Sequence, residues 1–137
     1  MIDELLYRTI IKNIPILCVD IIIQNENLDY LLAKRINQPL QDEWWVVGGR
    51  VNLGENCDDA AKRKLKEELN LEINELNFIG YYEDCFENNS FDDNVKYHTL
   101  SIVFKCTIKS TKNINLDNQH KEIGWFKHLP LRLKIKN

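Results

Sequence analysis

The chain has 137 residues, 44% hydrophobic and 28% charged, and its 18 Lys and Arg residues against 21 Asp and Glu residues give a formal net charge of −3. A chain of this size can bury one core that folds without a disulfide or a structural metal, so we expect a single domain over residues 1–137. The mildly acidic balance provides no broad basic field for a nucleic-acid backbone, which argues against DNA or RNA as a partner.

The cysteines are too far apart in the sequence to form a zinc site. They lie at Cys18, Cys57, Cys85 and Cys106. No CxxC pair occurs, so we expect reduced thiols, as in a cytoplasmic protein. The apolar run over residues 16–23 is broken by Asp20 and is far shorter than the roughly 20 residues that span a bilayer. We therefore expect neither a membrane segment nor a signal peptide.

Hydrophobic spacing predicts secondary structure along the whole chain. In chain order we expect a helix over 4–11, strands over 16–24 and 28–34 that form a hairpin, a strand over 44–47 that runs into two glycines, a helix over 57–69, and strands over 76–86, 97–108 and 123–126. This order, mostly strands with one strong central helix, predicts an α/β or α+β domain.

The helix over 57–69 is expected to turn an acid toward the core. At about 100° per residue, one apolar stripe contains Ala60, Ala61, Leu65 and Leu69. Glu68 falls within that stripe, where a carboxylate is costly unless it is paired, hydrogen-bonded or metal-bound. Lys64, four residues earlier, offers an ion pair. Alternatively, backbone carbonyls of the glycines before the helix offer a shared magnesium site. The helix alone leaves both alternatives open.

The segment over residues 49–71, GRVNLGENCDDAAKRKLKEELNL, resembles the Nudix box. That box reads glycine, five residues, glutamate, seven residues, Arg-Glu, an aliphatic residue, any residue, Glu-Glu, any residue, glycine and an aliphatic residue. The matching positions are Gly49, Glu55, Arg63, Leu65, Glu67, Glu68 and Leu71, whereas Lys64 and Asn70 depart from the pattern. The resemblance implies the Nudix fold, a mixed β-sheet sandwiched between helices, and Mg²⁺-dependent cleavage of a diphosphate linked to another moiety.

The departure at Lys64 points to one branch of that family. Lys64 replaces a glutamate that commonly binds metal, and the GDP-mannose mannosyl hydrolases also lack this acid. The segments PILCVDIII, YLLAKRINQP, WWVVGGRV and DNQHKEIGW are similar to that branch in type and order. The resemblance implies attack of water at the anomeric carbon of a nucleotide sugar with inversion, which releases nucleoside diphosphate and free hexose. It also implies a homodimer.

The same resemblance assigns roles residue by residue. One Mg²⁺ is expected at Gly48, Glu68 and Gln119, with His120 as general base, Arg35 and Arg50 on the diphosphate, and Asp20 and Arg63 at further substrate-binding positions. The chemistry suits these residue types, because a histidine is largely neutral at pH 7 and the planar donor fork of arginine matches phosphate oxygens.

Two other functions remain open from the sequence. Retention of both Glu67 and Glu68 favours a conventional Nudix pyrophosphohydrolase that cleaves a phosphorus–oxygen bond of a nucleotide sugar or similar diphosphate. A buried pair of Lys64 with Glu68 favours a non-catalytic Nudix module that senses a nucleotide. The identity of the base and of the hexose also stays open.

Overall fold

The computed structural model describes residues 2–37, 39–87, 96–110, 114 and 122–137. Its elements are α1 (Glu4–Asn13), β1 (Ile16–Gln24), β2 (Tyr30–Lys34), β3 (Trp44–Trp45), β4 (Val47–Arg50), α2 (Cys57–Leu69), β5 (Asn77–Phe86), β6 (Tyr97–Thr107) and β7 (Ile123–Phe126). Every predicted element is present. The single strand expected over 44–47 is instead two strands, because β3 pairs with β2 whereas β4 pairs with β1.

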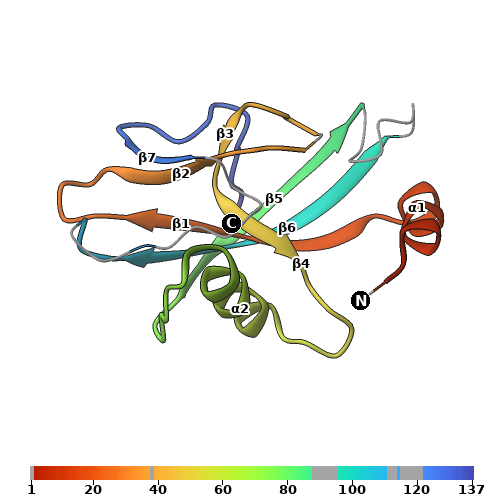
Figure 1. The fold of residues 1–137 in the computed structure, drawn as a ribbon, viewed down its shortest axis with the longest axis horizontal. Coiled ribbons are helices and arrows are strands. Elements are labelled where there is room, and N and C mark those ends of the chain that lie inside the picture. The colour runs from red at the N-terminus through yellow and green to blue at the C-terminus, as the bar shows by residue number, and fades with distance from the viewer. Residues whose placement is uncertain (1, 38, 88–95, 111–113, 115–121) are drawn as a thin grey trace.

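The strands of the described residues form one mixed sheet, in the order β3-β2-β1-β6-β5, with β4 also paired to β1 and β7 to β2. β1 runs parallel to β6 and antiparallel to β2 and β4. It lies at the centre of the sheet (Figure 1), and eight of its nine residues are buried. A central strand is covered on both faces, which explains why its sequence is almost continuously apolar.

The two faces of the sheet are covered differently. Alternate residues of β1, such as Val19 and Ile21, share a core cluster with the buried stripe of α2, which lies against one side of the sheet (Figure 1). On the other face Ile22 packs with Leu133 of the C-terminal segment, and Cys18 packs with α1 at one end. The predicted sheet between helices is therefore confirmed, with the C-terminal segment completing the second face.

Helix α2 ends where its sequence departs from the Nudix box. Asn70 adopts the left-handed conformation with φ of 54°, and its N–H donates to the carbonyl of Lys66 at 3.0 Å. Glycine is favoured there, but asparagine tolerates this conformation better than most residues do. The turn returns Leu71 to the core, where it is 1% exposed. Within the described residues, neither α1 nor α2 has the length and apolar character of a membrane-crossing helix.

Candidate active site

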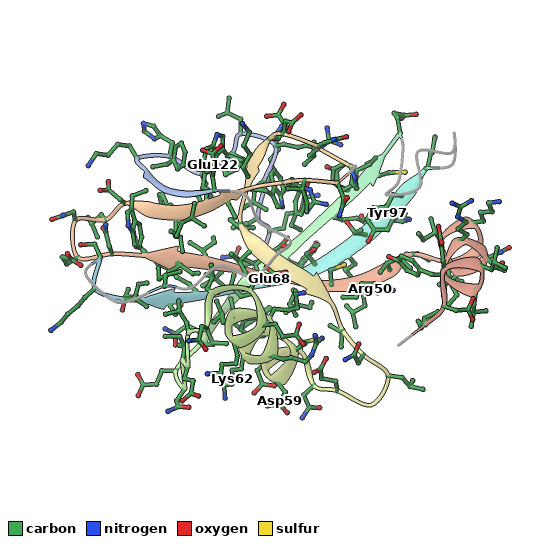
Figure 2. The ribbon with its side chains drawn as sticks, viewed as in Figure 1. Arg50, Asp59, Lys62, Glu68, Tyr97 and Glu122 are labelled. Carbon is green, nitrogen blue, oxygen red and sulfur yellow. The ribbon has the colours of Figure 1, made fainter. Side chains whose placement is uncertain are left out.

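The side chain of Glu68 points from α2 into the protein. It is 5% exposed, and its Oε1 lies 2.9 Å from the Nζ of Lys64, which is itself only 15% exposed. Figure 2 shows Glu68 where α2 faces β4, whereas Asp59 and Lys62 lie on the side of the helix away from the sheet. The inward orientation predicted from the helical wheel is confirmed, and the Lys64 pair that the sequence left open is formed.

Two glycines allow α2 and β1 to approach β4 closely. A Cβ at Gly48, whose register partner is Asp20, would lie 2.3 Å from both the carbonyl oxygen of Val19 and Oδ1 of Asp20. A Cβ at Gly49 would lie 2.5 Å from the Cε of Lys64. The methylene stem of Lys64 therefore lies against the backbone of Gly49. Only glycine fits at either position without a shift of its neighbours.

Asp20 is a buried carboxyl group beside these glycines. Burial is the main reason why its pKa rises to about 7, and the negative charge of Glu68 raises it further. A hydrogen bond from Ser101 and the positive charge of Arg35 act in the opposite direction. Arg35 and Glu68 are thus close enough to affect Asp20, although the three residues come from separate parts of the chain. Sequence reasoning did not find Ser101, because nothing in β6 marks it apart from its neighbours.

The two predicted diphosphate-binding arginines are held in different ways. Arg35 follows β2, and its Nε donates to the carbonyl of Pro39 at 2.7 Å. Arg50 ends β4, and its guanidinium lies 4.0 Å from the centre of the Tyr7 ring on α1. The hydroxyl of Tyr7 is in turn 3.2 Å from that of Tyr97 (Figure 2 labels Arg50 and Tyr97). The contribution of α1 to the site was not predicted, since a tyrosine on the inner face of a helix is ordinarily a packing residue.

Arg63 fastens the loop before α2 to the helix. Its Nε and one terminal nitrogen donate to the two oxygens of Glu55 at 2.8 and 3.0 Å, and the same terminal nitrogen donates to the carbonyl of Arg50 at 2.9 Å. These hydrogen bonds lower the pKa of Glu55 and raise that of Arg63. In this structure Arg63 thus supports the backbone that carries Arg50, and its substrate-binding role remains a prediction.

The described donors fit one hard cation and not a carboxylate cluster. Glu68 is the buried acid of α2, and this helix packs on β4, which contains Gly48, so carboxylate and carbonyl oxygens of the kind that Mg²⁺ prefers come from two adjoining elements. Among the residues that the structure describes, no three His, Cys, Asp or Glu side chains gather as a metal site. The predicted ligand Gln119 and the predicted base His120 lie outside the described residues.

Comparison with known proteins identifies the family of the chain. The sequence model of the NUDIX domain matches residues 15–136. The chain is 30% identical to the low-salt glycan biosynthesis protein Agl8 of Haloferax volcanii over 120 residues, which cover 88% of this chain and 76% of that protein. It is 36% identical to an ADP-ribose pyrophosphatase of Methanocaldococcus jannaschii over 90 residues, which cover 66% and 49% of the two chains. The chain belongs to the Nudix hydrolase family.

The fold is also that of solved Nudix structures. The crystal structure of the MutT NUDIX hydrolase from Burkholderia pseudomallei superposes with a TM-score of 0.72 at 22% sequence identity, and the match covers 89% of this chain and 92% of that one. At this identity the likeness establishes the fold.

Replacing Arg63 with lysine should loosen the loop before α2. Lysine keeps the charge but cannot make the three hydrogen bonds to Glu55 and Arg50, so we expect a loss of about 1–3 kcal/mol in unfolding free energy. Amide exchange over residues 51–56 should also become faster. Lys62→Gln, on the outer side of the same helix, is the matched control and should change neither quantity. An unchanged unfolding free energy and unchanged amide exchange in Arg63→Lys would show that the hydrogen bonds of Arg63 do not hold the loop.

The raised pKa of Asp20 predicts a specific pH dependence of stability. The stabilising effect of protonated Asp20 is fully present below its unfolded pKa of about 4 and is lost as pH rises through its folded pKa of about 7. In chelator-treated protein, the unfolding free energy of the wild type relative to Asp20→Asn should therefore fall across this window, by a few kcal/mol at most. Denaturant titrations at several pH values measure the difference, and parallel profiles for the two proteins would contradict the assignment.

Proposed function

We propose that this protein hydrolyses a nucleoside diphosphate sugar of the GDP-mannose type in a Mg²⁺-dependent reaction. Water attacks the anomeric carbon with inversion, and the products are nucleoside diphosphate and free hexose. The observation that carries the proposal is the inward Glu68, which pairs with Lys64 at a position where the box has another acid, while the stem of Lys64 lies against Gly49. The relative from Haloferax volcanii is named for glycan biosynthesis, which is consistent with a substrate that bears a sugar.

The charges of the site suit departure of a diphosphate. Breaking the bond between carbon and oxygen leaves negative charge on the leaving group, where the guanidinium groups of Arg35 and Arg50 would stabilise it. A bound Mg²⁺ would neutralise part of the same charge as a Lewis acid. Attack at phosphorus commonly uses a cluster of metal ions held by several carboxylates. The described residues offer one inward box acid paired with a lysine, which favours the carbon–oxygen route.

His120 is the proposed general base for the attacking water. An unperturbed imidazole is largely neutral at pH 7 and accepts a proton efficiently near that pH. In this proposal Asp20 and Arg63 complete the substrate site, and Gln119 joins Glu68 and the Gly48 carbonyl as metal ligands. The chain acts as a homodimer in this scheme.

Two other functions each have a specific observation in their favour. Glu67 is half exposed and lies beside the Glu68 pair, with its Oε2 3.6 Å from the Nζ of Lys64. Two adjacent box acids and the similarity to an ADP-ribose pyrophosphatase favour a conventional pyrophosphohydrolase. The formed Lys64–Glu68 pair favours a nucleotide-sensing module without catalysis. Such a module would bind nucleotide with no linkage to metal, which calorimetry with and without Mg²⁺ detects.

Product analysis separates the two hydrolytic reactions. With GDP-mannose and Mg²⁺, the proposal predicts GDP as the phosphorus-containing product by phosphorus NMR, with release of free mannose, and in water labelled with oxygen-18 the label should enter the sugar. GMP with mannose phosphate, and label in a phosphate, would instead establish attack at phosphorus. ADP-ribose serves as the competing substrate. Absence of turnover on both substrates would favour the sensing module.

Replacement of His120 tests the proposed base. His120→Gln should lower turnover by about 100-fold or more, the usual range for loss of a general base, with little change in unfolding free energy. His98→Gln is the control, because His98 lies on β6 and its Nε2 contacts Glu83 at 3.2 Å on an exposed part of the sheet. A loss of less than about threefold in His120→Gln would remove this residue from the base role.

A further inference from the structure

The ammonium group of Lys64 forms an ion pair with the carboxylate of Glu68, which is the proposed metal ligand. Nζ lies 2.9 Å from Oε1 of Glu68, within the range of a charge-assisted hydrogen bond. Both side chains are largely withdrawn from water, so their attraction is weakly screened. A ligand oxygen that accepts this hydrogen bond has its charge already partly neutralised, which weakens it as a donor to Mg²⁺.

Packing keeps Lys64 at this position. Its stem lies against Gly49 so closely that an added Cβ there would meet Cδ at 2.9 Å and Cε at 2.5 Å. The lysine is therefore confined between α2 and β4 and is not a flexible surface side chain. Lys66, two residues further along the same helix, provides the contrast, because it is 52% exposed and pairs with Glu72 at 3.1 Å.

The local charge is altered by this one residue. Within the described residues, a chain of ion pairs connects Glu68 and Lys64 to Glu67, Arg63 and Glu55, and the charges of these five groups sum to 2 − 3 = −1. With the usual box glutamate at position 64, the same group would carry 1 − 4 = −3. A divalent cation is therefore attracted much less strongly here than by the complete box.

Glu67 lies where it can receive the displaced ammonium. Its Oε2 is 3.6 Å from Nζ of Lys64 in the present arrangement, and its side chain is 50% exposed. A small movement of Nζ away from Glu68 would shorten this second contact while the stem stays against Gly49. Lys64 thus has two acceptors, one inside the site and one at its rim.

We infer that Lys64 is an internal competitor for the metal at Glu68: the metal binds Glu68 only when the ammonium shifts toward Glu67. This inference rests on the proposed metal-dependent function and adds a determinant of metal affinity to it. It also assigns a function to the lysine at position 64, because Lys64 lowers the affinity for free Mg²⁺ while the ligand Glu68 is retained.

Calorimetric titration of the metal-free protein with Mg²⁺ alone tests the inference. Lys64→Gln keeps most of the stem but removes the charge, and it should lower the Kd for Mg²⁺ by about tenfold or more. Lys64→Arg retains a competing cation and should bind no more tightly than the wild type. Lys66→Gln removes a screened surface charge and should change Kd by about twofold at most. Glu68→Gln should abolish this binding in every background.

A second measurement, NMR of the lysine side-chain nitrogens, uses the wild-type protein and therefore does not depend on the folding of a variant. On addition of Mg²⁺, the ¹⁵Nζ resonance of Lys64 should shift while that of Lys66 stays in place. Equal Kd values for wild type and Lys64→Gln, or an unmoved Lys64 resonance at saturating Mg²⁺, would overturn the inference. If GDP-mannose is still cleaved to GDP and mannose, the proposed function survives that result. If Lys64→Gln binds Mg²⁺ more tightly but the wild-type protein does not cleave GDP-mannose, the inference is upheld and the proposed function is rejected.

Discussion

The carboxylate of Glu68 is turned into the protein and balanced by the ammonium of Lys64, and the arrangement around the site follows from this constraint. Withdrawing both charges from water costs free energy that their mutual attraction must offset. The pair is formed within α2, and the stem of Lys64 can lie against β4 because Gly49 has no side chain there, while Gly48 allows the same close approach of β1. The apolar stripe of α2, which shares one core cluster with β1, holds the helix in that position.

The same close approach gathers side chains from distant parts of the chain. Asp20 on β1 lies beside Gly48, and its buried carboxyl group is affected by both Arg35 and Glu68. Arg63 reaches from α2 to Glu55 and to the backbone of Arg50, which connects helix, loop and strand. α1 supports the side chain of Arg50 from the other face of the sheet. The site is therefore assembled by tertiary packing around a short glycine strand.

Most of the fold was predictable because its patterns are local. The β-branched run of β1 and the periodicity of α2 each depend on near neighbours in the sequence, and the inward position of Glu68 follows from helical geometry alone. The division of residues 44–50 into β3 and β4 was missed, because it depends on two different partner strands. Likewise, no local pattern could show that Arg50 stacks on Tyr7 or that Ser101 hydrogen-bonds to Asp20. The helical wheel offered both the lysine pair and a metal site for Glu68. The pair is formed, and the contact of the Lys64 stem with Gly49 depends on long-range packing that the helix alone does not show.

The central claim is that Glu68 remains a metal ligand even though Lys64 stands in place of the usual acid. A crystal structure of the protein with Mg²⁺ and GDP tests it most directly. We expect one cation about 2.1 Å from a carboxylate oxygen of Glu68, next to the diphosphate, with Nζ of Lys64 withdrawn toward Glu67. GDP bound with Lys64 still on Glu68, and with no cation at that carboxylate, would contradict it.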